Sequence, residues 1–320
     1  MSLNVGPSPR LYRPGASALL QSATPDNPYK NHPVVSGCVA SKGSRVWMVS
    51  PRRLQIESEI NPHMKLANRV DPRQALKEWW SLRELYQQLG CDVNWFVPQP
   101  GVPDQVFTAN AGVIYVDKSG EKALIPSTFW HPERQKEVPH IIAQAKALGL
   151  KVSLDAYDPK LKHEGVAELM PYVDSKGENY LLGTHGFRTD PDAHRQIAEH
   201  LGMRDRLILL KLVDPLGYHG DVCCFPIGKG MVAYYPDAFD RDSQDKLKEL
   251  VPNLFAVSQA DYRLFVCNGV AVDKNVVVSA LSRDSTFETF LEKHGYAARQ
   301  TYLGQSLKSG GSARCQTLFC

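Results

Sequence analysis

The sequence predicts an α/β fold built from five similar units, each with one helix and several short strands. Five times along the chain, a stretch with helical periodicity ends at Gly or Pro and a strand-like stretch follows at once. These end points are Gly90, Gly149, Gly202, Pro252 and Gly295, which lie about fifty residues apart. Such a period is typical of stacked or radially arranged units, while an ordinary α/β sheet with alternating elements remains open.

The five helix–strand pairs follow one another along the chain with hairpin-like strands between them. They are expected at residues 71–96, 132–155, 190–213, 237–258 and 285–303. In the first pair, Asp71 is the expected N-cap, Pro72 takes the first helical position, and Gly90 ends the helix. Hairpin strands are expected between the helices, for example at residues 112–127 and 230–236.

The composition is typical of a soluble globular protein without a nucleic-acid or membrane partner. The 320 residues carry a net charge of +3, and 43% are hydrophobic. No run of Lys or Arg indicates a nucleic-acid or membrane surface, and the longest apolar stretches have the length of strands. The seven cysteines are irregularly spaced, which argues against a disulfide framework and predicts a cytoplasmic location.

The chain is predicted to form an irregular N-terminal arm over residues 1–34 and one domain over residues 35–320. The arm is rich in Pro, Ser, Asn and Gly and lacks an apolar run of signal-peptide type, although a short helix fits at residues 15–22. The far end, residues 307–320, is a Gly- and Ser-rich segment that carries Cys315. Chain termini are usually poorly ordered unless contacts hold them, so this segment is either a disordered tail or a functional part of the molecule.

Each unit carries a distinctive polar loop fifteen to twenty residues after its end point. The loops are FTANAG with Asn110, HEGVAE with Glu164, YHGDVCC with His219 and Asp221, VCNG with Asn268, and SGGSARC with Cys315. If the units surround an axis, these loops converge on one point. A carboxylate, a histidine and a thiol at one point form a catalytic set, which a purely structural array does not need.

Cys315 is the candidate nucleophile, because the glycines beside it allow close approach of a substrate. The alternative is a small packing residue near the terminus. His219 and Asp221 are spaced i and i+2, so on a strand both face the same side, with His219 as general acid/base. Glu164 is interpreted as a carboxylate for a cationic substrate or as a surface residue.

Neither a metal nor another cofactor is expected. HEGVAE lacks the second histidine of a zinc-protease motif, and the cysteines show no zinc spacing. The sequence contains no nucleotide-binding glycine motif.

The ordered set of FTANAG, EGVAE, HGD, CN and the terminal LKSGG-ARC-T resembles the guanidine-modifying enzymes, the amidinotransferase or arginine deiminase superfamily. The resemblance runs from about residue 46 to the C-terminus. It implies a five-unit αβ-propeller (pentein) of ββαβ repeats with a pseudo-fivefold arrangement. It also implies that Cys315 attacks the guanidinium carbon and that His219 protonates the leaving amine and later activates water. Glu164 and Asp221 then bind the guanidinium nitrogens.

Within that superfamily, the motifs are most similar to those of the arginine dihydrolases, which release ornithine, two ammonia and carbon dioxide. Deiminases usually have a carboxylate where this chain has Asn110, and an amide can both donate to and accept from a neutral ureido group. SEINPHM and FWHPERQKE resemble segments of the arginine dihydrolases, which implies that Asn61 lies near the amino-acid end of the substrate and that Arg134 clamps the α-carboxylate. Asn268 and Glu168 complete the predicted substrate-binding set.

Several alternatives remain open at this stage. Asn110 can instead cap a turn, and Arg134 can be an ordinary basic residue in the first turn of a helix. The chain departs from the family pattern at Glu168, where Asp is commoner, and at Gly220 and Ser312. A dimethylarginine hydrolase, an arginine deiminase, an amidinotransferase and a non-catalytic arginine-binding propeller are the competing functions. The partner is a small guanidino compound in each case, and a homo-oligomer remains open.

Overall fold

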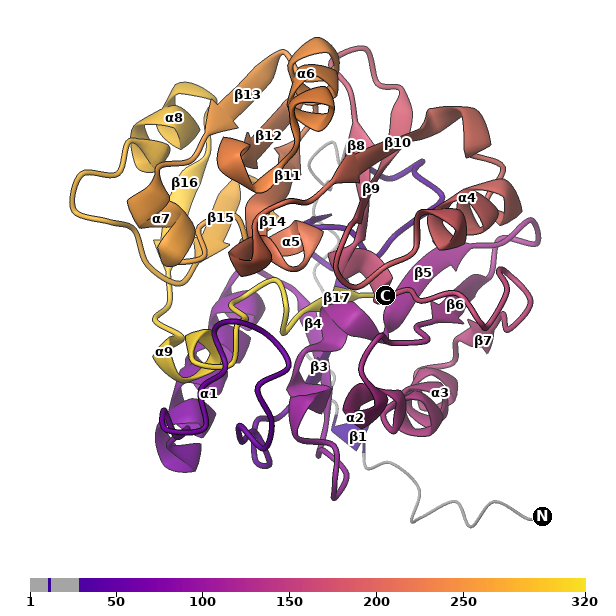
Figure 1. The fold of residues 1–320 in the computed structure, drawn as a ribbon, viewed down its shortest axis with the longest axis vertical. Coiled ribbons are helices and arrows are strands. Elements are labelled where there is room, and N and C mark those ends of the chain that lie inside the picture. The colour runs from indigo at the N-terminus through magenta and orange to yellow at the C-terminus, as the bar shows by residue number, and fades with distance from the viewer. Residues whose placement is uncertain (1–10, 13–28) are drawn as a thin grey trace.

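The computed structural model describes residues 11–12 and 29–320, and within them the strands form five small sheets (Figure 1). The strands are β1 Leu11–Tyr12, β2 Val39–Ala40, β3 Arg45–Val49, β4 Asp92–Phe96, β5 Gly112–Val116, β6 Lys122–Pro126, β7 Lys151–Val152, β8 Leu169–Val173, β9 Asn179–His185, β10 Leu207–Lys211, β11 Cys224–Gly228, β12 Met231–Tyr234, β13 Asn253–Ala256, β14 Val270–Val272, β15 Asn275–Val278, β16 Ala297–Gln300 and β17 Leu318–Phe319. The fold is therefore mixed α/β with several sheets and not one continuous sheet.

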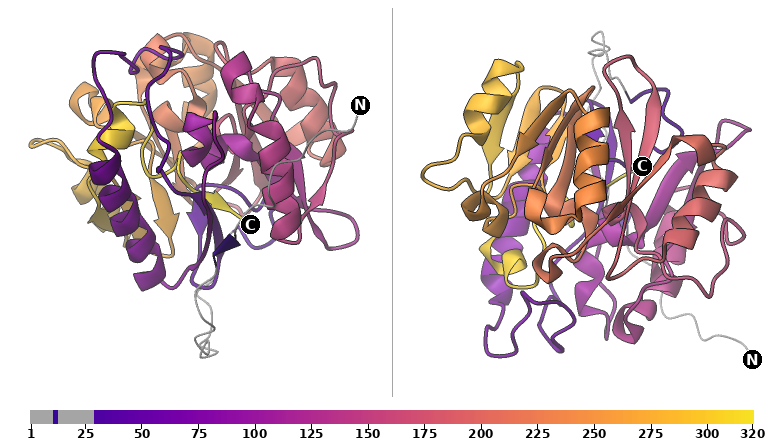
Figure 2. Two further views of the ribbon diagram at one scale, coloured as in Figure 1. Left: turned by 90° about the horizontal axis from the view of Figure 1, so that it is seen from below. Right: turned by 45° about the horizontal axis from the view of Figure 1, so that its top comes forward.

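The helices connect the strands within each unit. They are α1 Pro72–Gln88, α2 Pro132–Gln135, α3 Val138–Ala147, α4 Pro191–His200, α5 Gly220–Cys223, α6 Arg241–Leu250, α7 Gln259–Arg263, α8 Phe287–Lys293 and α9 Gly304–Leu307. In Figures 1 and 2, α1, α3, α4, α6 and α8 lie toward the outside and the strands lie inside.

All five sheets share one pattern, in which an antiparallel pair is extended by a parallel third strand. In the second unit, β5 pairs antiparallel with β6, the chain passes through α2 and α3, and β7 then pairs parallel with β6. The same order holds for β8, β9, α4 and β10, for β11, β12, α6 and β13, and for β14, β15, α8 and β16. The predicted unit of one helix and several strands is confirmed.

The predicted helix ends are also confirmed, and their cause is local. Gly90, Gly149, Gly202 and Gly295 have φ of 83°, 80°, 67° and 74°, the left-handed conformation that glycine adopts most easily after a helix. At the start of α1, the Asp71 carboxylate accepts hydrogen bonds from the backbone N–H groups of residues 73 and 74 at 2.9 and 3.2 Å.

The C-terminal segment is tied into the first sheet. Strand β17 pairs antiparallel with β3, with Leu318 opposite Trp47, and β3 continues to β4 in parallel. The sheet thus joins two parts of the chain about 270 residues apart. Cys315 is 1% exposed, so this segment is part of the core and not a frayed tail.

Part of the predicted arm is described. Leu11 and Tyr12 pair antiparallel with Phe96 and Trp95 of β4 as strand β1, and Val34 forms a bridge with Tyr115. The helix considered at residues 15–22 lies outside the described residues.

The inner strands are buried on both faces, which explains their continuous apolar sequences. Every residue of β8, β11 and β12 is buried, and the helices cover the sheets with apolar faces such as Trp79 and Leu82 of α1.

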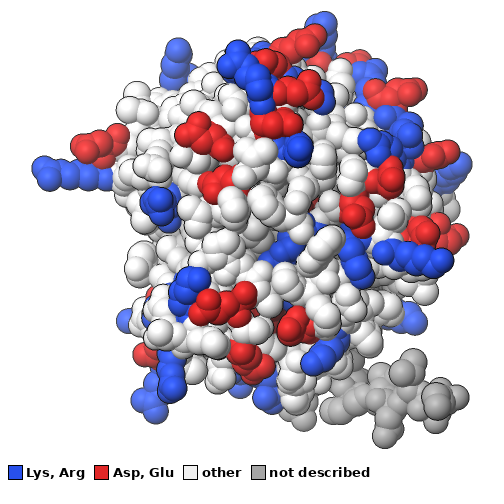
Figure 3. Space-filling view, viewed as in Figure 1, with Lys and Arg blue, Asp and Glu red and all other residues white. Residues whose placement is uncertain are grey.

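Within residues 11–12 and 29–320, no helix is long and apolar enough to cross a bilayer. On the face seen in Figure 3, Lys and Arg are interspersed with Asp and Glu, so that face has no extended patch of one sign.

Candidate active site

The five polar loops occupy equivalent places, because each directly precedes the first strand of a sheet. Asn110 lies before β5, Glu164 before β8, His219 before β11, Asn268 before β14 and Cys315 before β17. A small cavity, of about 250 Å³ including its open side, lies at these loops. Five of the nine predicted site residues line it, namely Asn61, Asn110, Arg134, His219 and Cys315. Glu164, Asp221 and Asn268 contact this group directly, as described below.

Asn268 fixes the loop that carries Cys315. Its Oδ1 accepts from the backbone N–H groups of Ser312 and Cys315 at 2.9 and 3.1 Å, and its Nδ2 donates to Cys315 Sγ at 3.2 Å. All three side chains are buried. The thiol is therefore held in one position by a single amide that reaches across from the neighbouring unit.

The Asp221 carboxyl lies beside the thiol. Its Oδ2 lies 3.5 Å from Cys315 Sγ. Burial, followed by the charge of Asp221, raises the pKa of Cys315 well above its ordinary value. Burial also raises the pKa of Asp221 to about 7, against the opposing effect of Arg314. Without a cation in the cavity, the site therefore favours the neutral thiol.

His219 and Glu164 form a buried pair with a defined proton. The distance from Nε2 of His219 to Oε2 of Glu164 is 2.7 Å. Burial opposes ionisation of Glu164, but Arg188 and His219 hold its pKa well below the ordinary range. Burial lowers the pKa of His219 to about 4, although Glu164 acts in the opposite direction. The imidazole is then neutral with its proton on Nε2, because an ionised carboxylate can only accept.

The remaining imidazole nitrogen is available for proton transfer. Nδ1 of His219 is buried and has no hydrogen-bond partner within the part of the chain that the structure describes. A buried ring nitrogen without a partner beside a candidate nucleophile is a position for a general base.

The predicted strand placement of His219 and Asp221 is wrong. His219 is the N-cap of the short helix α5, and Asp221 lies within its first turn. The sequence spacing i and i+2 therefore does not put both side chains on one face of a strand. Strand β11 begins only at Cys224, where the chain leaves this helical turn.

Arg134 is held in a fixed orientation by Glu137 and Asn110. Its Nε and Nη2 donate to the two carboxylate oxygens of Glu137 at 2.8 and 3.0 Å, and its Nη1 donates to Asn110 Oδ1 at 2.9 Å. Asn110 Nδ2 donates to the carbonyl of Glu164 at 3.3 Å. The guanidinium lies over the ring of Phe129, 4.7 Å from its centroid. Arg134 thus lines the cavity with most of its donors already used.

Arg188 is a cavity residue that the sequence patterns did not indicate. It follows β9, and its Nη1 lies 3.3 Å from Oε2 of Glu164. Its guanidinium lies 4.9 Å from the centroid of the Tyr218 ring. Asp104, also missed, lines the same cavity, and its Oδ1 has no hydrogen-bond partner among the described residues. Burial raises the pKa of Asp104 to about 6. Neither residue belongs to a recognisable motif, so only the fold reveals them.

Asn61 and Glu168 are placed differently. Asn61 lines the cavity, and its side chain connects the irregular segment before α1 to the catalytic loop by donating to the carbonyl of Ser309 at 3.1 Å. Glu168 is fully buried and contacts Thr184 and the backbone N–H of Gly220. It is not among the residues that line the cavity. A direct contact of Glu168 with substrate stays a prediction.

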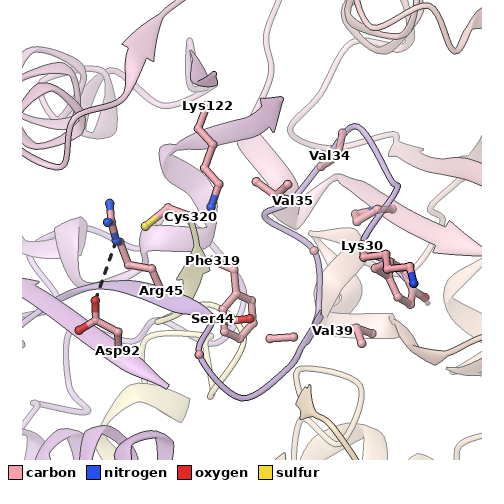
Figure 4. Close-up of a pocket in the computed structure, with 15 residues that line it drawn as sticks. Lys30, Val34, Val35, Val39, Ser44, Arg45, Asp92, Lys122, Phe319 and Cys320 are labelled. Atoms are coloured by element: carbon pink, nitrogen blue, oxygen red, sulfur yellow. Dashed lines mark ion pairs between the residues drawn. The ribbon is translucent and has the colours of Figure 1, made fainter. Parts of the chain in front are cut away.

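A larger cavity, of about 1190 Å³ including its open side, lies elsewhere in the structure (Figure 4). Phe319 and Cys320 at the end of β17 line it together with Arg45, Lys122 and Val35, and none of the nine predicted site residues does.

Among residues 11–12 and 29–320, no group of three or more His, Cys, Asp or Glu side chains is arranged to hold a metal ion. The seven cysteines are all unpaired.

Comparison with known proteins agrees with this geometry. Residues 51–319 match the family described as N,N dimethylarginine dimethylhydrolase, eukaryotic. The chain is 34% identical over 277 residues to the N(G),N(G)-dimethylarginine dimethylaminohydrolase of Mycobacterium tuberculosis, which covers 86% of this chain and 85% of that one. The chain belongs to the guanidine-modifying enzymes. The resemblance in the sequence motifs is thereby confirmed, and the chain is a hydrolase of C–N bonds in linear amidines.

Arginine dihydrolases are similar to this guanidine-modifying enzyme to the same degree. The bifunctional arginine dihydrolase/ornithine cyclodeaminase ArgZ of Synechocystis is 32% identical over 277 residues, which is 86% of this chain but 37% of ArgZ. The crystal structure of the N-terminal domain of cyanobacterial ArgZ with bound substrate has a TM-score of 0.78 at 31% identity, and covers 86% of this chain and 97% of that domain. The mixed α/β fold with several small sheets is thus the pentein fold.

Proposed function

We propose that the protein is an arginine dihydrolase that converts free arginine to ornithine, two ammonia and carbon dioxide through a covalent intermediate on Cys315. The observation that carries the proposal is the grouping of Cys315, Asp221, and the His219–Glu164 pair at a cavity that also exposes two arginines. A sensor that only binds arginine does not need a thiol and a proton-transfer pair at one cavity.

The electrostatics favour a cationic substrate. Without a ligand, burial and Asp221 keep the thiol protonated. A guanidinium beside Asp221 and Glu164 supplies the positive charge that favours the thiolate, so the substrate itself activates the nucleophile. The Cys315 thiol gives its proton to Nδ1 of His219, and the thiolate attacks the guanidinium carbon. The C–N bond to one terminal nitrogen then breaks, and His219 passes that proton to the nitrogen as it leaves as ammonia.

Water completes each half of the reaction. His219 removes a proton from water, the resulting hydroxide attacks the carbon bound to sulfur, and the C–S bond breaks to give a ureido group. A second cycle on that group releases a second ammonia, and the final carbamate loses carbon dioxide. Arginine and two waters thus balance ornithine, two ammonia and carbon dioxide.

The amino-acid end of arginine meets complementary charges. Arg188 and Arg134 line the cavity as candidate partners for the α-carboxylate, while Asp104 with its unpartnered Oδ1 is suited to the α-amino group. Arg134 uses three nitrogens on Glu137 and Asn110, whereas Arg188 donates through Nη1 to Glu164 and through Nη2 to the carbonyl of Ile60. Asn61 lies beside them. This pattern favours a free amino acid over a guanidino group within a peptide.

The second candidate is a dimethylarginine hydrolase, which the family match and the mycobacterial relative favour. Asn110 favours the dihydrolase, because its neutral amide does not repel the oxygen of a ureido group. A direct test incubates the protein separately with arginine and with asymmetric dimethylarginine. A dihydrolase gives ornithine and about two ammonia per arginine, whereas release of dimethylamine and citrulline from dimethylarginine alone supports the second candidate.

We further infer that the five sheets surround a pseudo-fivefold axis that ends at this cavity. The supporting observations are their common strand order and the equivalent positions of the five loops. Residues 35–320 then form the catalytic αβ-propeller, and residues 1–34 precede it as an arm. A cytoplasmic location is part of the same proposal.

A further inference from the structure

Two of the positions at which the sequence departs from the family pattern touch each other in the structure. Oε2 of Glu168 accepts a hydrogen bond from the backbone N–H of Gly220 at 3.1 Å. Glu168 lies 52 residues before Gly220, at the end of the loop that carries Glu164. Both residues are buried, and Gly220 is the first residue of α5. The two departures therefore form one structural feature.

Thr184 makes this feature rigid. Its hydroxyl contacts Oε2 of Glu168, and its carbonyl is bonded to Nε2 of His194 at 2.7 Å. An added Cβ at Gly220 would lie 2.1 Å from Oγ1 of Thr184, so only glycine fits at that position without movement. The backbone of Gly220 is thus pressed against Thr184 while Glu168 holds its N–H.

The N–H that Glu168 binds lies between the predicted general acid/base His219 and the predicted substrate-binding residue Asp221. Gly220 separates His219 from Asp221 and is the first residue of α5. The N-cap residue of this helix is His219, whose side chain makes no capping hydrogen bond because it is paired with Glu164. The Glu168 carboxyl therefore supplies an acceptor for the first of the N–H groups that a helix start leaves without an intrahelical partner.

We propose that Glu168 is a positioning residue that aligns His219 and Asp221 with Cys315 by holding the backbone of Gly220, and that it does not touch the substrate. The inference rests on the proposed function. Its geometric basis is that one carboxyl fixes the peptide from which the imidazole and the Asp221 carboxylate both project. A shift of about 1 Å in such groups can cost about 10²-fold in rate.

The charge of Glu168 is not needed for this role. Burial, together with the nearby charges of Glu164 and Asp221, raises the pKa of Glu168 well above its ordinary value, although the hydrogen bonds from Thr184 and Gly220 act in the opposite direction. Glutamine has the same shape, and its amide oxygen can accept from both Gly220 and Thr184. A glutamine at this position therefore preserves the arrangement, whereas alanine removes it.

The test compares Glu168→Gln and Glu168→Ala with the control Asp174→Ala. Asp174 is a suitable control because it is buried, lies at the far end of the same β8–β9 hairpin, and accepts from the backbone N–H groups of residues 176 and 178 at 2.8 Å each. We expect kcat per alkylatable Cys315 to fall about 10²-fold in Glu168→Ala with KM changed less than about threefold. Glu168→Gln and Asp174→Ala should retain at least about a third of the parent kcat.

Three results overturn the inference. An unchanged kcat per alkylatable Cys315 in Glu168→Ala leaves only a role in stability, and a raised KM with unchanged kcat in that variant indicates contact with the substrate. A loss of kcat in Glu168→Gln equal to that in Glu168→Ala shows that the shape of the side chain is not what matters. If Glu168→Ala does not fold, Glu168→Asp takes its place, because the shorter side chain withdraws the acceptor from Gly220.

A readout without substrate separates this inference from the proposed function. The proton on His219 Nε2, bonded to Glu164, should give a distinct downfield resonance in the folded parent. Glu168→Ala should shift or broaden it, and Asp174→Ala should not. A parent that turns over neither arginine nor dimethylarginine contradicts the proposed function, while an unmoved resonance in Glu168→Ala contradicts the positioning role.

Discussion

Replacing Glu137 by glutamine removes one charge from a buried ion pair and leaves the other charge in place. Arg134 and Glu137 have side chains that are 4% and 3% exposed, and two parallel hydrogen bonds of 2.8 and 3.0 Å join them. Arginine stays protonated in proteins, so Glu137→Gln leaves a buried cation with a neutral partner.

The magnitude follows from that burial. Breaking a buried pair by removing one partner typically costs about 3–5 kcal/mol. At roughly 1.5 °C for each kcal/mol in a chain of 320 residues, the midpoint of thermal unfolding should fall by about 4 to 8 °C. Because Arg134 also donates to Asn110, we expect kcat/KM for arginine to fall at least about tenfold as well.

The assay is thermal unfolding followed by circular dichroism, with Asp245→Asn as the control. Asp245 pairs with Arg241 at 3.0 Å, but these side chains are 53% and 81% exposed, and exposed pairs add little to stability. The control should unfold at the parent temperature. A fall of less than about 2 °C in Glu137→Gln, with unchanged kinetics, refutes the view that Arg134 depends on this carboxylate.

Three further predictions use the same structure. His219→Ala should lower kcat by about 10²–10⁴-fold while an alkylating reagent still reaches Cys315, and activity within tenfold of the parent rejects the acid/base role. Asn110→Asp should shift the products from ornithine toward citrulline and one ammonia, measured by amino-acid analysis; a variant that still makes only ornithine contradicts the role of the amide. The contribution of His32, His194 and His219 to stability should be lost as the pH decreases from about 6.5 to 4, because burial lowers their pKa to about 4 and the unfolded chain binds those protons first, while Asp104 and Asp221, whose pKa burial raises, act in the opposite direction. A denaturant midpoint with the same pH dependence in the parent and in His194→Gln argues against a neutral buried His194.

The features that the sequence predicted well depend on local chemistry. The glycines that end the helices and Asp71 at the start of α1 act on neighbouring backbone groups, so their effect is visible in a few residues. The convergence of Asn110, His219 and Cys315 was predictable because their loops recur at one place in each unit.

The features that the sequence did not predict depend on contacts between distant segments. Arg188 reaches the site only because the end of β9 lies beside the loop of Glu164. The strand expected at His219 is a helical turn instead, and the acceptor at its first N–H comes from Glu168, 52 residues away. The pairing of β17 with β3 is more distant still, and it is what buries Cys315.

The central claim is that Cys315 attacks the carbon of a guanidino group, and acid quenching during turnover followed by mass spectrometry tests it directly. The account predicts that the peptide with Cys315 carries a transient adduct equal to arginine minus ammonia. It also predicts that Cys315→Ser folds like the parent, forms no adduct and has no turnover. An adduct on another residue, or turnover retained by Cys315→Ser, would contradict the account.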